Sequence, residues 1–204
     1  MTTATTGPAA ADARPMRADA RRNFDRLLEQ ARLAFVERGI DASLEDIARR
    51  AGVGIGTLYR HFPTRQDLVL AVVRTRMEAL RVQAEQLLDA PDPEWAMVTW
   101  LTAYLRHASE FRGLADSMAE VVRGDERKRS ACDGMHAAAG QLLARAQRAG
   151  LIRDDVDVLD LFAIIHAVAW ATERCGARTG RAERTLDVML RGLKAELQPG
   201  PAGR

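Results

Sequence analysis

Apolar residues recur along most of this chain at intervals of three and four, the spacing of helices that bury one side. The first such stripe lies between about Ala18 and Arg38 and contains Phe24, Leu27, Leu28, Ala31 and Phe35. Gly39 follows this stripe, at a position where helices commonly end in a left-handed residue. Alanine, leucine and arginine dominate the composition and β-branched runs are few, so the sequence predicts an all-α fold.

Two short helices joined by a tight turn are predicted between Ser43 and Phe62. Ser43 suits an N-cap, and Asp46 three residues later makes a near capping box, with Asp where Glu or Gln is usual. Gly52 suits the left-handed residue that ends the first helix. The second helix is therefore expected to begin at about Gly54.

The outer face of this second helix has the chemistry of a DNA contact. A helical wheel places Leu58 and Phe62 on the inner side, and Gly56, Thr57 and Arg60 on the opposite side. Glycine lets a backbone come close to DNA, threonine offers a hydroxyl and a methyl, and arginine can bridge two acceptors of guanine. The pattern predicts a helix-turn-helix whose second helix enters a major groove.

Positive charge is concentrated around the predicted helix-turn-helix. The whole chain has a net charge of +2, but residues 14–65 contain 11 Arg against 7 acidic residues. This is the electrostatic footprint that DNA binding requires. Tyr59 and His61 flank the outer face, where they could contact phosphates. Arg65 lies in the first turn of the next helix, where a positive charge is unfavourable unless an anion such as a phosphate is close.

Longer helices are predicted after the helix-turn-helix. Thr64 and Asp67 can cap a helix that runs to about Asp89, and Pro91-Asp92-Pro93 then breaks the chain. Further helices are expected over 94–110, 114–122, 125–149 and 156–177, and a last one carries the apolar stripe Leu186, Met189, Leu190, Leu193 and Leu197. The predicted organisation has about nine helices in three parts. These are a flexible tail at 1–17, a three-helix DNA-binding domain at 18–64 and a larger helical ligand-binding and dimerisation domain at 65–204.

The helix over 156–177 is apolar on two faces and must be buried twice in a protein of this size. The simplest arrangement puts one face against its own domain and the other against a second subunit. Together with the last helix it would form a four-helix interface in a homodimer. The predicted interface residues are Leu161, Ile165, Val168, Thr172, Leu186, Met189, Leu190 and Leu193.

Enzymatic and metal-binding motifs are not visible in the sequence. It contains no Gly-rich phosphate loop, nucleophile elbow or zinc-finger spacing, and Cys132 with His136 supplies only two ligands at helical spacing. Cys132 and Cys175 are expected to be packing residues. No catalytic residue, metal or cofactor is therefore predicted. No signal peptide or membrane-spanning run is visible, so a cytoplasmic protein is expected.

The run from Thr57 to Phe62, TLYRHF, followed by Thr64 to Leu68, TRQDL, resembles the DNA-binding signature of the TetR family of bacterial transcriptional regulators. The resemblance extends from about Ala20 to Val73. It implies a homodimer on a palindromic double-stranded operator. It also leaves Ile55 free to touch a thymine methyl, although the helical wheel turns this residue toward the core. The predicted DNA-binding residues are Ser43, Gly54, Ile55, Gly56, Thr57, Tyr59, Arg60, His61 and Arg65.

The same resemblance implies a small-molecule effector that binds the larger domain and releases a repressor from its operator. Apolar pockets with a few polar tips commonly bind such molecules. The predicted ligand-binding residues are Met97, Trp100, Tyr104, His107, Met118, Met135, His166 and Trp170. Two alternatives stay open: a small-molecule- or metal-binding helical protein or enzyme whose helix-turn-helix is only structural, and an adaptor whose helix-turn-helix packs against protein.

Overall fold

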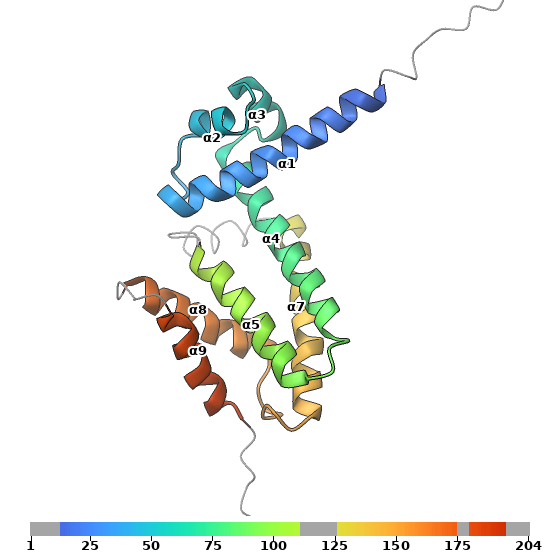
Figure 1. Ribbon diagram of the computed structural model, residues 1–204, viewed down its shortest axis with the longest axis vertical. Helices are drawn as coiled ribbons and strands as arrows, with labels where there is room; N and C mark the ends of the chain where they lie inside the picture. Colours follow the sequence, from blue (N-terminus) through green and yellow to red (C-terminus); the bar gives the residue numbers. More distant parts are fainter. Residues whose placement is uncertain (1–12, 111–125, 175–179, 195–204) are drawn as a thin grey trace, which may run out of the picture. The chain divides into compact units, whose positions relative to one another are not determined.

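A computed structural model describes residues 13–110, 126–174 and 180–194, and the regular structure in these ranges is helical (Figure 1). The eight helices are α1 (Ala13–Arg38), α2 (Leu44–Arg50), α3 (Ile55–His61), α4 (Arg65–Leu87), α5 (Pro93–Glu110), α7 (Glu126–Arg148), α8 (Val158–Arg174) and α9 (Arg181–Gly192). The all-α prediction is confirmed. The short helix expected over 114–122 lies outside the described residues.

The chain divides into two compact units, residues 1–72 and residues 73–204. The first unit contains α1, α2, α3 and the beginning of α4, and the second contains the rest of α4 with α5, α7, α8 and α9. The sequence placed the division at residues 64 and 65, just before α4. In the structure the division falls inside α4, which is therefore a single helix that belongs to both units.

The N-terminal helix begins earlier than the sequence predicted. The sequence predicts a flexible tail over residues 1–17, whereas α1 begins at Ala13, inside that range. Pro15 did not prevent helix formation, because the first N–H groups of a helix have no acceptor within it and a proline there loses nothing. Residues 1–12 lie outside the described part of the chain.

The first unit packs around a small aliphatic and aromatic core. Leu27, Ile47 and Leu58 are fully buried, one from each of α1, α2 and α3, and the rings of Phe24 and Phe62 lie 5.1 Å apart between centroids. The turns are set by glycines, since Gly39 and Gly52 have φ angles of 77° and 69° after α1 and α2. Both predicted glycine stops are confirmed.

Two helices begin with a reciprocal capping box. At the start of α4, the Thr64 hydroxyl accepts from the Asp67 N–H at 3.1 Å, and an Asp67 carboxylate oxygen accepts from the Thr64 N–H at 2.9 Å. At the start of α8, Asp157 and Asp160 make the same exchange, at 2.9 Å in each direction. These bonds satisfy N–H groups that a helix cannot satisfy itself. The predicted Thr64 cap is confirmed.

In the second unit, α5 packs against α7, α8 and α9, and α8 packs against α7 and α9. Trp100 on α5 is fully buried, and its indole N–H donates to the Leu80 carbonyl of α4 at 2.9 Å. Arg145 on α7 donates to the carbonyls of Leu87, at 3.1 Å, and of Ala90. Hydrogen bonds therefore hold the later turns of α4 within this unit.

Candidate DNA-binding and effector sites

The outward face of α3 is exposed. Ile55 is 37% exposed and Tyr59 46% exposed, Arg60 is exposed, and Thr57 is half-buried. Leu58 is the fully buried residue of this helix. The wheel's assignment of Ile55 to the core is wrong, because only Leu58 and Phe62 are covered on that side.

Two glycines leave open space on this face. A Cβ atom added to Gly54 or Gly56 would meet no atom within 4 Å. Gly54, the N-cap of α3, has a φ angle of −72°, and neither glycine has a positive φ. Neither the backbone conformation nor the packing of the described residues requires glycine here, so the sequence keeps this surface free of side chains for another reason.

His61 at the end of α3 is half-buried. Its ring lies 5.8 Å from that of Phe24 on α1 in an edge-on arrangement, and 6.2 Å from that of Phe62. This residue was predicted as a DNA contact. Its ring also helps to pack α3 on α1, a role that the wheel did not indicate.

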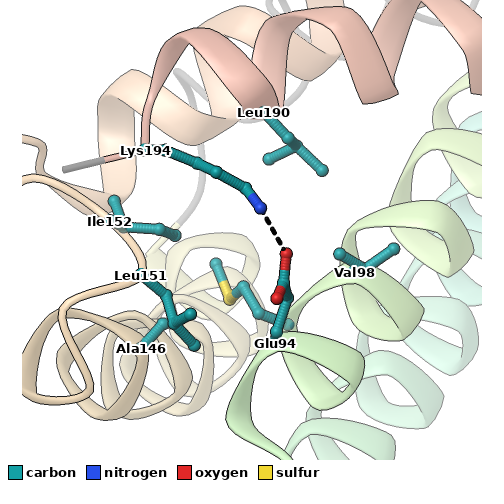
Figure 2. Close-up of a pocket in the computed structure, with 8 residues that line it drawn as sticks. Glu94, Val98, Ala146, Leu151, Ile152, Leu190 and Lys194 are labelled. Carbon is teal, nitrogen blue, oxygen red and sulfur yellow. Dashed lines mark hydrogen bonds and ion pairs between the residues drawn. The ribbon is translucent and has the colours of Figure 1, made fainter. Parts of the chain in front are cut away.

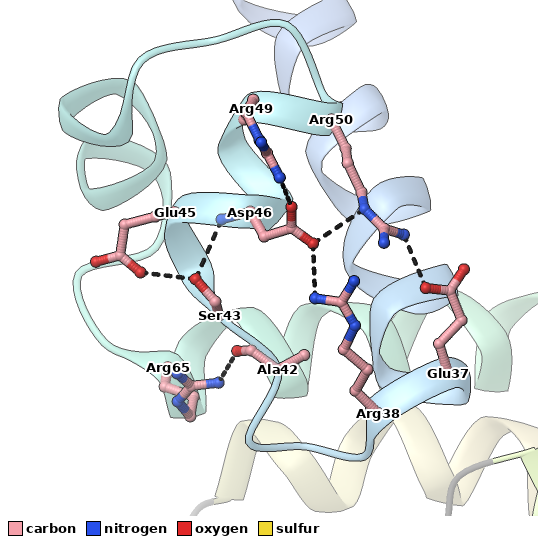
Figure 3. Close-up of polar contacts among 9 residues, drawn as sticks. All are labelled: Glu37, Arg38, Ala42, Ser43, Glu45, Asp46, Arg49, Arg50 and Arg65. Carbon is pink, nitrogen blue, oxygen red and sulfur yellow. Dashed lines mark hydrogen bonds and ion pairs between the residues drawn. The ribbon is translucent and has the colours of Figure 1, made fainter.

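Ser43 caps α2 as predicted. Its hydroxyl oxygen accepts from the Asp46 N–H at 3.2 Å, and the hydroxyl donates to a Glu45 carboxylate oxygen at 2.9 Å (Figure 3). The backbone and the Ser43 hydroxyl lower the pKa of Glu45, and the charge of Arg65 lowers it further. The start of α2 therefore has a well-defined polar network.

Asp46 joins α1 to α2 through three arginines (Figure 3). Its carboxylate accepts from Arg38 of α1 at 2.9 Å, from Arg50 at 3.0 Å and from Arg49. Arg50 also pairs with Glu37 of α1 at 2.9 Å. The hydrogen bond from Arg49, followed by the charges of Arg50 and Arg38, lowers the pKa of Asp46. The predicted return bond of a capping box is replaced by this ion-pair network.

Arg65 binds backbone within its own unit. Its Nη1 donates to the carbonyl oxygen of Ala42 at 2.5 Å (Figure 3). It also donates to that of Ile40 at 2.9 Å, and both acceptors lie in the loop between α1 and α2. The side chain is half-buried. A phosphate contact by Arg65 stays a prediction, but the structure gives this guanidinium a second role that the sequence did not indicate.

Most of the predicted ligand-binding residues are buried in the second unit. Met97, Trp100, Tyr104, His107 and Met135 are at most 6% exposed, Trp170 is 60% exposed, and His166 is also exposed. Met118 lies outside the described residues. At 60% exposure Trp170 is not enclosed within one subunit, and its place in a ligand site stays a prediction.

Aromatic rings and imidazoles form one cluster in this unit, which we call the ring cluster: Trp100, Tyr104, His107, His136, Phe162 and His166. Trp100 stacks on Tyr104 with centroids 5.5 Å apart, and Phe162 lies 4.9 Å from Tyr104 and 4.5 Å from His136. The Tyr104 hydroxyl lies 3.2 Å from Nε2 of His166. The set combines a large apolar surface with polar tips, as small-molecule sites do.

The three imidazoles of the ring cluster are neutral near pH 7. Burial lowers the pKa of His107 to about 4, helped by the charges of Arg76 and His166. Partial burial also lowers the pKa of His136. The ring of His166 is shielded by its neighbours on one side although the residue as a whole is exposed, and this partial burial, followed by the charge of His136, lowers its pKa. Neutral imidazoles can donate and accept hydrogen bonds, and they favour an uncharged ligand surface over a cationic one.

A small pocket lies elsewhere in the second unit, between α5, α7 and the end of α9 (Figure 2). It holds about 30 Å³, and an ion pair between Lys194 and Glu94 at 2.8 Å stands beside it. The lining residues are Glu94, Met97, Val98, Ala146, Leu151, Ile152, Leu190 and Lys194. Only Met97 belongs to the predicted ligand set, and the volume suits about two water molecules rather than an effector.

The predicted dimer interface needs correction. Leu161, Ile165, Val168 and Leu186 are at most 2% exposed, so they belong to the core of their own unit and cannot also cover a partner. Met189, Leu190 and Leu193 are half-buried, and the side chain of Thr172 lies outside the described part. Among the described side chains of α8 and α9, the large apolar residues with high exposure are Leu159 and Trp170 on α8, at 61% and 60%, and Val188 on α9, at 67%.

Across residues 13–110, 126–174 and 180–194, no three His, Cys, Asp or Glu side chains gather in a way that could hold a metal ion. None of the helices in these ranges combines the length and the apolar character that a bilayer crossing requires.

An exposed recognition helix in a helix-turn-helix unit, followed by a larger helical unit, defines the class of helical DNA-binding regulators. Comparison with known proteins agrees with this class. Residues 27–72 match the family described as bacterial regulatory proteins of the tetR family, and residues 92–195 match the C-terminal domain of SbtR-like transcriptional regulators. The chain belongs to the TetR family of transcriptional regulators.

Individual relatives support this membership. The TetR transcriptional regulator SCO0520 from Streptomyces coelicolor is 37% identical, with a TM-score of 0.68 over 84% of this chain and 98% of that one. A TetR transcription regulatory protein from Mycobacterium vanbaalenii is 38% identical, with a TM-score of 0.62 over 88% and 99%. An HTH-type transcriptional regulator from Staphylococcus aureus strain USA300 is 37% identical over 75 residues, which span 36% of this chain and 40% of that protein.

Proposed function

We propose that this protein is a homodimeric repressor that binds a palindromic operator through α3 and leaves it when a small molecule binds the second unit. The single observation that carries this proposal is the outward face of α3. That face combines an exposed arginine, an exposed aromatic and two glycines around which space is left open. It would act as a regulator rather than an enzyme, in the bacterial cytoplasm where the operator is found.

The geometry of α3 supports direct reading of bases. Gly54 and Gly56 would let the helix backbone come close to the groove, while Arg60 could bind the two acceptors of a guanine. Ile55, which is exposed, could touch a thymine methyl, and Tyr59 could bind a phosphate. Two such helices in a homodimer would contact half-sites about 34–36 Å apart, or a multiple of this spacing.

The uncovered residues of α8 and α9 support dimerisation. Leu159 and Trp170 on α8 and Val188 on α9 are large apolar side chains, and each is at least 60% exposed. Because a two-fold axis brings the same surface of two subunits together, α8 and α9 of each subunit would form a four-helix interface. Both helices keep their other sides in the core of their own unit, through Leu161 and Leu186.

The ring cluster supports an effector site for a largely apolar molecule with an acceptor or donor for Tyr104 and His166. Such a ligand would have to separate rings that now touch, so its binding would favour a different arrangement of the second unit. A ligand can shift the protein from one state to another only by binding the two with different affinity. The uninterrupted helix α4 would carry that change to the DNA-binding unit.

A binding titration tests the proposal. Duplexes from the DNA flanking its own gene are titrated against a shuffled duplex of the same length, at two salt concentrations. Sequence-specific, salt-sensitive binding is expected; sequence-blind binding would contradict the proposal.

Within this titration, Arg60→Ala should cost about 1–3 kcal/mol and relax the base preference at one operator position. Arg74→Ala, which removes an exposed arginine of α4, serves as the matched control. Equal weakening on all sequences would show instead that Arg60 binds phosphate.

A further inference from the structure

Helix α8 has an exposed strip along one side, which we call the α8 strip. Its members recur at intervals of three and four residues, so they lie on one side of the helix. All of them are exposed: Leu159, Ala163, His166, Ala167 and Trp170. Four are apolar, and the titratable member, His166, lies between the two largest apolar side chains. A partner that covers Leu159 and Trp170 therefore covers His166 as well.

His166 belongs to the ring cluster as well as to the α8 strip. On its inner side, Nε2 lies 3.2 Å from the hydroxyl of Tyr104, and the two ring centroids are 5.7 Å apart. Tyr104 is a buried residue of α5. On its outer side, His166 is exposed to solvent in the single subunit. A covering partner would close this outer side and leave the imidazole enclosed all round.

The groups that face His166 from α5 and α7 do not favour a positive charge on it. From α5 come the neutral hydroxyl of Tyr104 and the imidazole of His107, whose pKa is lowered in part by the charge of His166. From α7 comes His136, whose charge lowers the pKa of His166. Asp133, also on α7, acts on His136, where it raises the pKa against the larger effect of burial. The inner surroundings thus oppose protonation of His166.

Charged residues of α8 and α9 lie at the edges of the same region. On α8, Asp160 accepts from the backbone N–H of Asp157 at 2.9 Å, at the start of the helix. Helix α9 packs on α8. Its exposed charged residues are Arg181, Glu183, Arg184, Asp187 and Arg191. Asp187 is paired with Arg191 at 2.9 Å. None of these residues is a member of the α8 strip, whose other side chains are apolar.

Burial by a partner would make the charged form of His166 still less favourable. Partial burial, followed by the charge of His136, already holds the pKa of His166 below its ordinary value of 6.5. Closing the outer side with apolar residues removes the water that could solvate an imidazolium, which lowers the pKa further. The separate subunit would then bind a proton at a higher pH than the dimer does. Association is therefore unaffected by pH above the pKa of the separate subunit and is weakened as the pH falls below it.

We propose that the partner subunit covers His166 together with Leu159 and Trp170, so that the dimer requires a neutral His166 in both subunits and dissociates in acid. This inference rests on the α8–α9 dimer proposed above. Because two-fold symmetry places one His166 in each half of the interface, dissociation takes up two protons. A palindromic operator is bound by the dimer, so acid would be a second signal that releases the operator without a small molecule.

Sedimentation equilibrium of the full chain tests this proposal. The dissociation constant of the dimer is measured from about pH 7.5 to about pH 5.5 at constant ionic strength. It should stay constant at neutral pH and rise below the ordinary pKa of 6.5, with a slope that approaches about 100-fold per pH unit for two protons. Circular dichroism at each pH verifies that the subunits remain folded.

Three variants assign the effect to His166. His166→Gln keeps a polar tip for Tyr104 and cannot carry a charge, so its dissociation constant should not change with pH. His166→Phe is also uncharged and gives the same test if the glutamine variant does not fold. His136→Gln is the matched control, because it removes a half-buried imidazole of the same cluster that lies outside the α8 strip. It should keep the pH dependence and begin to lose the dimer at a higher pH.

The possible contrary results identify what failed. A natural dimer with a constant dissociation constant would overturn the inference and leave the proposed dimer intact. The same pH dependence in His166→Gln or His166→Phe would assign the protons to other groups. A dimer that tightens in acid would show that a carboxylate of the partner pairs with His166, the opposite of an apolar cover. If the chain is monomeric even at about pH 7.5, the proposed dimer fails and the inference fails with it.

Discussion

The two units of this protein are stabilised by different kinds of contact. In the first unit, α1 and α2 are joined at their rim by Asp46 and its three arginines, over a core supplied by a few side chains such as Leu27 and Ile47. In the second unit, the contacts at the centre are rings, with Trp100 and Tyr104 stacked and three neutral imidazoles nearby. The first unit therefore adds an ion-pair network to its apolar core, whereas the second unit has a cluster of rings at its centre.

The difference extends to what each unit leaves exposed. The exposed residues of α3 include Ile55 and Tyr59 together with an arginine and glycines. Such a surface suits DNA, which presents charged phosphates and the edges of bases. On α8 and α9 the exposed set is Leu159, Trp170 and Val188, a surface suited to apolar protein. The two units therefore differ in the solution conditions and in the substitutions that should disrupt them.

The largest effect is expected where the second unit exposes Trp170. Trp170→Arg should weaken dimerisation by about 4 kcal/mol, twice a hot-spot loss of about 2 kcal/mol, because a two-fold interface contains the residue twice. Sedimentation equilibrium measures the dissociation constant. Trp95→Arg changes a similarly exposed tryptophan on α5 and should have little effect. A dimer equally stable with both substitutions would place the interface elsewhere.

Acid should destabilise the second unit through His107. Burial lowers the pKa of His107 from its ordinary value of 6.5 to about 4 in the folded protein. At a pH between these two values, His107 binds a proton in the unfolded chain but not in the folded one. The contribution of His107 to the free energy of unfolding is therefore fully present above about pH 6.5. It is lost as the pH drops toward 4, by about 3 kcal/mol in all. Tryptophan fluorescence follows this loss in the second unit alone, since all three tryptophans lie there.

His107→Phe tests the source of this acid sensitivity. The variant should lose a large part of the pH dependence, while His136 and His166 keep a smaller part in the same direction. His61→Phe, in the first unit, is the control and should leave the fluorescence-detected transition unchanged. Equal pH dependence in His107→Phe and the natural protein would assign the effect to other groups.

The first unit should respond to loss of a single carboxylate. Asp46→Asn keeps the size of the side chain but leaves Arg38, Arg49 and Arg50 without their shared anion, and their mutual repulsion remains. We expect the thermal midpoint of this unit to fall by about 5 °C, measured by circular dichroism. Asp41→Asn removes an exposed carboxylate nearby and serves as control. If both variants melt alike, the network contributes no stability.

The smallest effect is expected for a glycine of α3, whose replacement should raise the stability of the protein and lower its affinity for DNA. Gly56→Ala should stabilise α3 by at most about 1 kcal/mol, because alanine favours helix and its Cβ meets no neighbour. The same methyl would stand between α3 and DNA, so operator affinity should fall. Gly140→Ala in α7 also places its Cβ in open space and should stabilise without weakening DNA binding. Tighter or unchanged DNA binding by Gly56→Ala would contradict a close approach of α3.

Local features of the fold were predictable from the sequence. Ser43 and Thr64 cap helices because their partners lie three residues away, and Gly39 and Gly52 end helices because of their own backbone freedom. Most of the exposed face of α3 follows from a wheel anchored on Leu58, although that wheel turns the exposed Ile55 toward the core. These features depend on residues within one or two helical turns, so a sequence shows them directly.

Features that depend on distant partners were not predictable. Arg65 binds the carbonyl of Ile40, 25 residues earlier, which its position in the first turn of a helix does not reveal. The sequence shows two apolar faces on α8, but only packing decides which is buried in its own unit, and Leu161 proved to lie on the buried one. Asp46 could have been found in part, since Arg49 and Arg50 follow it at i+3 and i+4 spacing.

The continuity of α4 has a practical consequence for building hybrid regulators. A chimera that joins this DNA-binding unit to the sensing unit of another protein must make its junction inside a helix rather than in a loop. Each residue inserted or deleted between Arg65 and Leu80 would turn the later side chains by about 100° and shift them by about 1.5 Å relative to the earlier ones. Junctions that preserve the helical phase should yield working sensors, and those that change it by half a turn should yield proteins that bind DNA but ignore their inducer.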